Sequence, residues 1–295
     1  MSISKYEILV KTVELGSLTA AAKLLGCTQS AASHAINALE SESNLRIINR
    51  NRNGVSLTPD GQLLYPAIRD IVEAKGRFNE LLAALQGGDT GCVRIGSFTS
   101  VAVHWLPGMI KTFCTAYPKI ELQMLSGDYH DIAEWFSKDT IDVGFVTEKT
   151  NLAGCEYIPL KEDRLLAVLS KDHPLAGRDV ISVTELENEP FISLLEASDQ
   201  DARSVLEQAG ITVDVKFTTK DDYAIIAMVA QGLGISILPE LLLEGHPEVC
   251  TVPIEGGKKR TIGLAISPAG LISPSVQSFA QHVKNWVWER YSEEG

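Results

Sequence analysis

The segment over residues 17–57 most constrains the fold, because strong helix signals alternate in it with tight turns. The alanine-rich run over residues 18–25 has high helix propensity, and Ser17 or Thr19 can cap it. Gly26 marks a tight turn, and Thr28 then stands at the N-cap of a further helix predicted over residues 29–43. The apolar residues of that helix recur every three to four positions, so one face packs on the preceding helix.

The opposite face of the helix over residues 29–43 is polar. Short hydroxyl and amide side chains can reach base edges in a major groove, and Gln and Asn can bond adenine through two hydrogen bonds. Taken alone, a solvated face of a small helical hairpin explains the pattern equally well. The candidate DNA-contacting residues of this helix and its cap are Thr28, Gln29, Ser30, Ser33, His34 and Asn37.

Residues 45–57 contain two short β-prone runs around an Asn-Gly turn, which predicts a hairpin. Arg46, Arg50 and Arg52 lie within it. A basic hairpin directly after a helix-turn-helix is typical of a wing that contacts phosphates or the minor groove. The combination favours DNA binding over the solvated hairpin and adds Arg50 and Arg52 to the candidate contacts.

The net charge of −12 is distributed unevenly along the chain. The first 60 residues carry six basic and five acidic side chains, whereas the remaining 235 carry 20 basic and 33 acidic ones. The acidic excess therefore lies outside the segment predicted to meet DNA. There it limits non-specific binding, while a local basic strip suffices for phosphate contact.

A long helix is predicted from Pro59 onward, after Thr58 as its N-cap. Apolar residues follow at alternating steps of four and three, which is a heptad seam interrupted by Lys75. Pro66 is expected to strain or kink the helix. A helix packed on its own domain is the alternative, but the pattern favours dimerisation. The candidate dimerisation residues are Leu64, Ile68, Ile71, Phe78, Leu82 and Leu85.

After a glycine-rich hinge over residues 87–91, strand and helix signals alternate, which predicts an α/β fold with ligands at the carboxyl ends of strands. Strands are expected at residues 93–97, 120–125, 141–146, 165–170, 191–194, 213–217 and 235–238. Helices are expected at residues 106–116, 128–137, 200–209, 221–231 and 274–291.

The residues above carry a resemblance to LysR-type transcriptional regulators. The N-terminal part resembles their winged helix-turn-helix, although the family often has Pro where Ser30 stands and Arg where His34 stands. The remainder resembles the type 2 periplasmic-binding-protein fold of their effector domain. The resemblance is carried by Ala20 to Leu25, Thr28, Gln29, Ser33, Ile36, Leu39, Glu40, Leu45, Arg50, Leu57, Thr58 and Gly61, and then by Leu106-Pro107, Phe113, Tyr117-Pro118, Gly127, Asp142 to Gly144, His173 to Leu175 and Gly232 to Pro239.

The resemblance implies a multidomain chain. An α-rich winged helix-turn-helix over residues 1–58 is followed by a linker and dimerisation helix over residues 59–87. A two-lobed α/β domain like the periplasmic binding proteins then occupies residues 92–295. One lobe comprises residues 92–162 and 267–295 and the other residues 163–266, with two crossing strands between them and the effector cleft where they face each other.

The candidate effector-binding residues follow both from the resemblance and from their places at strand ends. Hydroxyls and free backbone N–H groups at converging helix N-termini favour an anion, and ordinary helix capping is the alternative for each residue. No arginine stands at these positions, and Glu196, Asp199 and Asp201 lie near the expected rim, so a small carboxylate and a polar neutral molecule both stay open. The candidates are Ser97, Thr99, Ser100, Gly127, Thr147, Ser193, Thr218 and Thr219.

Several other classes of protein are disfavoured by what the sequence lacks. No signal-peptide pattern or membrane-length apolar run is present, so a cytoplasmic protein is expected rather than a periplasmic solute-binding protein. The five cysteines and six histidines are scattered, so no metal or cofactor is expected. An enzyme is disfavoured because no G-x-S-x-G, P-loop or dinucleotide-binding motif occurs. The acidic C-terminal part disfavours an architectural DNA-coating protein.

The sequence thus predicts a non-enzymatic, sequence-specific transcription regulator. We expect a homodimer or homotetramer that binds a dyad-related operator in double-stranded DNA and responds to a small-molecule co-inducer. RNA polymerase is a further candidate partner. In the expected mechanism, the effector closes the cleft and changes how dimers pair, which alters the spacing of the DNA-binding heads and the bending of the operator.

Overall fold

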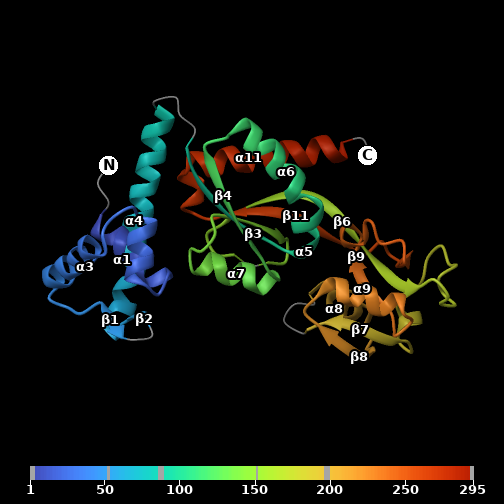
Figure 1. Ribbon diagram of the computed structural model, residues 1–295. Coiled ribbons are helices and arrows are strands. Elements are labelled where there is room, and N and C mark those ends of the chain that lie inside the picture. The colour runs from blue at the N-terminus through green and yellow to red at the C-terminus, as the bar shows by residue number, and fades with distance from the viewer. Residues whose placement is uncertain (1–3, 52–53, 86–89, 151, 196–199, 293–295) are drawn as a thin grey trace. The chain divides into compact units, whose positions relative to one another are not determined.

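The computed structural model describes residues 4–51, 54–85, 90–150, 152–195 and 200–292. The chain divides into two compact units, Met1–Gln86 and Gly87–Gly295. Each unit is described by itself below, with the element labels of Figure 1.

The first unit is a three-helix head followed by a hairpin and a long helix. Each of the three head helices begins after a hydroxyl residue, Ser4, Ser17 or Thr28, whose side chain accepts a backbone N–H of the first turn. The predicted helix-turn-helix and hairpin are confirmed. The elements are α1 (Lys5–Glu14), α2 (Leu18–Leu24), α3 (Gln29–Ser43), β1 (Ile48–Asn51), β2 (Gly54–Leu57) and α4 (Pro59–Leu85).

The core of this unit includes the beginning of α4. Ile68 is 6% exposed in the same cluster as Leu9 and Ile36, and Leu64 packs against that cluster. Gly61 makes the close approach possible, because a Cβ there would lie 2.1 Å from the carbonyl oxygen of Ile47. Leu64 and Ile68, two of the predicted dimerisation residues, therefore pack within the chain, which is the alternative given for this helix.

The second unit contains a first lobe built on a mixed sheet. Strands β3 and β4 pair in parallel, as do β3 and β5, and β11 pairs antiparallel with β5 and with the first half of β6. In Figure 1, α6 and α11 lie on one face of this sheet and α7 on the other. The elements are β3 (Gly91–Ser97), α5 (Thr99–His104), α6 (Leu106–Ala116), β4 (Ile120–Ser126), α7 (Tyr129–Ser137), β5 (Val143–Thr147), β6 (Glu156–Ser170), β11 (Lys259–Ile266), the short helix η2 (Gly270–Ile272) and α11 (Pro274–Tyr291).

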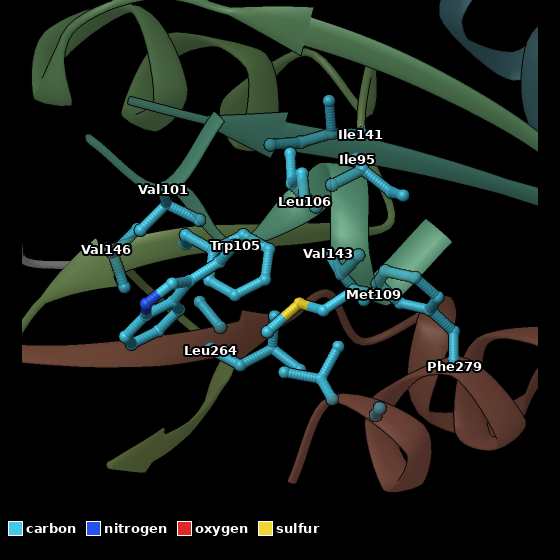
Figure 2. Packing of buried hydrophobic residues seen from close by; sticks show 14 of the residues in the cluster. Ile95, Val101, Trp105, Leu106, Met109, Ile141, Val143, Val146, Leu264 and Phe279 are labelled. Carbon is cyan, nitrogen blue, oxygen red and sulfur yellow. The ribbon is translucent and has the colours of Figure 1, made fainter. Parts of the chain in front are cut away.

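Large apolar side chains from both helical layers fill the core of the first lobe. Figure 2 shows Trp105 and Met109 beside Leu264 of β11, with Phe279 of α11 close by. All of β5 is buried, because helices cover both faces of the sheet there. This core joins the chain segments on either side of the second lobe into one body.

The second lobe is inserted between β6 and β11. Alternate residues of the second half of β6 face opposite cores, with Leu165 and Ala167 in one and Leu166 and Val168 in the other. That two-sided burial explains why this run is continuously apolar. The elements are η1 (Val183–Leu186), β7 (Pro190–Leu194), α8 (Gln200–Ala209), β8 (Asp214–Thr219), α9 (Asp222–Ala230), β9 (Ser236–Pro239), α10 (Glu240–Leu243) and β10 (Val249–Pro253).

The α/β architecture and most predicted elements of this unit are confirmed. The elements α5, α10, β10, β11, the first half of β6 and the short helices η1 and η2 were not predicted from the sequence. The predicted lobe boundary at residue 267 is too late, because Ile262 to Ile266 pair with Val143 to Thr147 of β5 and so belong to the first lobe.

Candidate functional sites

The first candidate site is the polar face of α3. Its start and its outward positions are solvent-exposed, whereas Ala32, Ile36 and Leu39 are buried toward the head. Of the six residues predicted on α3 and at its cap, Ser33 is half-buried and the others are exposed, namely Thr28, Gln29, Ser30, His34 and Asn37. The expected division of the helix into a core face and a free polar face is thus present.

Arg50 of β1 lies against this polar face. Its Nη1 donates to Ser33 Oγ at 2.9 Å, and its Nη2 donates to Asn37 Oδ1 at 3.0 Å. The guanidinium therefore holds two of the candidate base-reading side chains in place. Arg52, the other predicted wing contact, lies outside the described residues.

A second contact joins α3 to the start of the wing. Glu40 Oε1 accepts backbone N–H bonds from Ile47 at 2.8 Å and from Ile48 at 3.1 Å. Helix α3 is therefore bonded to the hairpin at two places. Glu40 bonds the backbone at the start of β1, and Arg50 further along β1 bonds side chains nearer the start of α3. Helix α3 and the hairpin thus form one hydrogen-bonded piece.

Helix α4 carries a continuous exposed stripe along the side that faces away from the head core. Lys75, the polar residue in the predicted seam, lies on the inner side, where Nζ bonds both carboxylate oxygens of Glu7 at 3.1 and 3.0 Å. Of the predicted dimerisation residues, Leu82 is half-buried, and Ile71, Phe78 and Leu85 are exposed. The exposed stripe comprises Leu63, Ala67, Ile71, Ala74, Phe78, Leu81 and Leu85.

The second candidate site is a cavity of about 330 Å³ in the second unit. Both lobes contribute to it, since α5 and the loop into α7 line one side, and α9 and β9 line the other. This volume lies near the lower end of the range of roughly 300–1,000 Å³ that holds small molecules in proteins. The charged and polar lining residues are Thr99, Ser100, Ser126, Asp128, Tyr129, Asp131, Asp201, Lys220, Asp221, Asp222, Ser236 and Arg260.

Arg260 is the central charged group of the cavity wall. The register of β11 and β6 places it directly opposite Asp163, and both side chains are 3% exposed. Asp163 Oδ2 accepts from Arg260 Nε at 3.0 Å and from Nη2 at 2.7 Å, while Oδ1 accepts the backbone N–H of Leu241 at 3.0 Å. Burial raises the pKa of the Asp163 carboxyl, and the adjacent guanidinium opposes that shift.

The remaining N–H groups of Arg260 connect the two lobes. Nη1 donates to Tyr129 Oη at 2.6 Å and to Asp201 Oδ2 at 3.0 Å, and Nη2 donates to Ser100 Oγ at 2.9 Å. Tyr129 also donates its hydroxyl proton to Asp201 at 2.9 Å. Burial raises the pKa of the Tyr129 phenol, so this group stays protonated. Residues of α5 and α7 in the first lobe are thereby bonded to α8 in the second.

The cavity brings together only part of the predicted effector site. Thr99, Ser100 and Gly127 line it. The side chains of Ser97 and Thr147 are buried in the fold instead. The Ser97 hydroxyl donates to the backbone carbonyl oxygen of Phe98. Ser193, Thr218 and Thr219 lie on β7 and β8 and are not among the lining residues.

Among the acidic residues expected near the rim, Asp201 lines the cavity, while Glu196 and Asp199 lie outside the described residues. The premise that free helix N–H groups converge on the cleft is wrong for α7 and α9. Carboxylates already cap both helices: Asp128 accepts from the backbone of Asp131, and Asp221 accepts from the backbone of Tyr223 and Ala224.

Arg260 and Asp222 are the main lining residues that sequence reasoning missed. One local signal existed for Arg260, because it stands in an apolar alternating run with Ile262, Leu264 and Ile266, which predicts a half-buried strand. Its partner Asp163 is 97 positions away, and no local pattern connects the two.

Within the described parts of the chain, no group of three or more His, Cys, Asp or Glu side chains is arranged to hold a metal ion. No helix there has the length and apolar character needed to cross a membrane.

A winged helix-turn-helix joined to a two-lobed domain with an interlobe cavity defines a ligand-responsive DNA-binding regulator. Comparison with known proteins agrees. The model of bacterial regulatory helix-turn-helix proteins of the lysR family matches residues 3–62, and that of the LysR substrate binding domain matches residues 86–288. The HTH-type transcriptional regulator YvbU of Bacillus subtilis (strain 168) is 33% identical over 96% of this chain and 98% of its own length.

The chain belongs to the LysR family of transcriptional regulators, as its motifs predicted. Solved structures share this fold over nearly all of the chain's length. A full-length OxyR variant from Pseudomonas aeruginosa gives a TM-score of 0.76 at 20% identity, covering 96% of this chain and 95% of that one. Full-length CbnR in complex with its target DNA gives 0.66 at 21% identity, covering 97% and 100%.

Proposed function

We propose that this regulator reads an operator with the polar face of α3 and is controlled by a small molecule bound in the interlobe cavity. The observation that carries the proposal is the cavity itself, because α5, α7 and α8 around it are bonded to one another through Arg260. A ligand that changes this contact changes how the lobes sit. Such a change can shift the pairing of subunits and hence the spacing of their DNA-binding heads.

The exposed stripe on α4 supports a homodimer as the unit that binds DNA. Two copies of the stripe would bury Ile71, Phe78 and Leu85 against each other, and two heads would then match a dyad-related operator. We further propose that dimers pair into tetramers and that the protein contacts RNA polymerase. It acts in the cytoplasm, where the chromosome lies. We also infer that the chain catalyses no reaction, in keeping with the regulators that it resembles.

The DNA-binding assignment predicts different effects for two substitutions. Gln29→Ala should weaken binding to the operator about tenfold to a hundredfold, because a two-hydrogen-bond base contact discriminates by roughly 1–3 kcal/mol. Arg52→Ala should instead weaken binding to every sequence and reduce the salt slope by about one, because it removes a phosphate contact. Gel-shift titrations at several salt concentrations measure both, on an operator selected from genomic fragments that the purified protein retains.

Lys11→Ala is the matched control, since Lys11 lies on α1 and pairs with Glu14. It should leave both affinity and salt slope near their original values. Equal losses for Gln29→Ala on operator and scrambled DNA would contradict the assignment of Gln29 as a base reader.

The effector assignment is tested by footprinting the operator with and without a ligand of the cavity. We expect the protected region to change in length or spacing when the cavity is saturated. An unchanged footprint at saturation would contradict control of the heads by this cavity.

A further inference from the structure

The wall of the interlobe cavity carries more negative than positive charge. Five aspartates line it, against the two cations Lys220 and Arg260. A sixth, Asp163, lies directly behind Arg260 and is bonded to it. A ligand entering this cavity therefore meets an acidic wall, which favours a cation over an anion. The five lining aspartates are Asp128, Asp131, Asp201, Asp221 and Asp222.

Arg260 has no N–H group left for an anionic ligand. A guanidinium has five N–H donors, and the five hydrogen bonds described above use all of them, on Ser100, Tyr129, Asp163 and Asp201. An incoming carboxylate would have to displace one of these acceptors. Displacing Asp163 would leave a buried charge unpaired, which is costly.

The first backbone N–H groups of α7 and α9 are used in the same way. At the start of α7, Asp128 and Asp131 form a capping box, in which each carboxylate accepts the other residue's backbone N–H. At the start of α9, Asp221 accepts two backbone N–H groups. The N-termini of α7 and α9 are thus already neutralised by the chain's own carboxylates, whereas the short helix α5 begins without a side-chain cap.

Asp222 differs from the other lining aspartates. It is half-buried at the first position of α9, and no cationic side chain among the described residues forms an ion pair with it. The Thr99 hydroxyl bonds its carboxylate and the Arg260 charge attracts it, while Asp221 and Asp201 repel its charge. Burial raises the pKa of Asp222, so its charged form lacks full compensation within the protein.

The rest of the cavity wall is apolar. Side chains from both lobes contribute, and the phenyl ring of Phe98 lies under the Arg260 guanidinium at 4.9 Å. A ligand that fills about 330 Å³ would therefore bury a hydrocarbon part beside its charged group. The apolar lining residues are Phe98, Leu194, Ile225, Ile237, Leu238, Pro239 and Leu242.

We infer that the effector is an amphipathic organic cation, an amine or guanidine compound whose charged group pairs with the carboxylate of Asp222. This inference rests on the proposed role of the cavity as the effector site. It replaces the expected anion, because Arg260 and the N-termini of α7 and α9 are already engaged by the chain's own acceptors, and the lining carboxylates outnumber the lining cations. Asp222 is then the residue that determines the charge of the ligand.

Isothermal titration calorimetry of the full-length protein measures the affinity for three pairs of probes. The two members of each pair share the same hydrocarbon part and carry opposite charges. The pairs are hexylammonium with heptanoate, benzylammonium with phenylacetate, and cadaverine with pimelate. At least one ammonium probe should bind about tenfold or more tightly than its carboxylate partner. Asp222→Asn should weaken that binding by about tenfold to a hundredfold, because a hydrogen bond to a charged group is lost.

Asp214→Asn is the matched control, since Asp214 is an exposed aspartate of β8 in the same lobe that does not line the cavity. It should change ammonium affinity by less than about twofold, the difference expected when no contact is lost. Preferred binding of the carboxylates, failure of every ammonium probe at millimolar concentration, or an ammonium affinity unaffected by Asp222→Asn would each overturn the inference.

Footprinting with the same probes separates this inference from the proposed function. A carboxylate that binds in the cavity and changes the footprint would keep the effector site and overturn the cation. An ammonium probe that binds through Asp222 and leaves the footprint unchanged would keep the cation and contradict the regulatory role of the cavity.

Discussion

Arg260 shows how a single residue can serve both folding and communication between the lobes. Its pairing with Asp163 follows from strand register, and all five of its donors are used. A buried pair of this kind contributes little net stability, because desolvation offsets the attraction. Loss of one partner, however, leaves the other charge buried without compensation.

Arg260→Met should therefore destabilise the second unit by about 3–5 kcal/mol, because Asp163 is left unpaired. Adding Asp163→Leu should recover a large part of that loss. All four tryptophans lie in the second unit, so tryptophan fluorescence during urea unfolding measures its free energy of unfolding. A double variant as unstable as Arg260→Met alone would show that the loss comes from packing rather than from an uncompensated carboxylate.

The same residues show how far the site was predictable. Thr99 and Ser100 were predicted because a strand followed by a hydroxyl and a helix start is a local pattern. Ser193, Thr218 and Thr219 have that pattern too, yet they are not among the lining residues of the cavity. The Arg260 network was missed because it depends on register between strands that are far apart in sequence.

At the scale of elements, α4 has two apolar faces with different partners. Ile68 faces the head core, and Lys75 pairs with Glu7 of α1, whereas Ile71 and Phe78 are exposed. A heptad pattern has the same period whether its partner lies in the same chain or in another. The sequence therefore predicted one seam where the structure has an internal face and an exposed stripe.

Two substitutions on α4 should separate these faces. Phe78→Glu should convert dimers to monomers without lowering the thermal stability of the head, because it places a charge on the exposed stripe. Ile68→Ala should instead destabilise the head by about 2–5 kcal/mol through a cavity in its core. Sedimentation velocity and circular dichroism measure the two effects.

Gln62→Glu adds the same charge at an exposed position of α4 outside the stripe, and it should leave the dimer intact. A Phe78→Glu protein that remains fully dimeric at low micromolar concentration would contradict dimerisation through the stripe.

For the whole molecule, two half-buried histidines of the first lobe, His104 and His282, make stability depend on pH. Burial lowers the pKa of His104 and of His282, and His104 Nε2 is buried without a hydrogen-bond partner among the described residues. Since each folded-state pKa lies below the unfolded value of about 6.5, stability is fully present above that pH. It falls as the pH drops through the folded-state values, because only the unfolded chain takes up protons readily.

The Tm of the fluorescence transition should therefore decrease between about pH 7.5 and about pH 5.5, by more in the wild type than in a His104→Gln, His282→Gln variant. The raised pKa values of Asp163 and Asp222 act in the opposite direction. They are the same in both proteins, so the difference between the two curves reports the histidines. Parallel curves would contradict this assignment.

Glu40 of α3 bonds the backbone at the start of β1, and Arg50 of β1 bonds side chains of α3. These contacts limit how such a regulator can respond. A head whose two proposed DNA-contacting parts, α3 and the hairpin, are hydrogen-bonded together has no internal joint with which to change the sequence that it prefers. A signal from elsewhere in the chain can then alter only where each head is placed along the duplex, not which bases it accepts there.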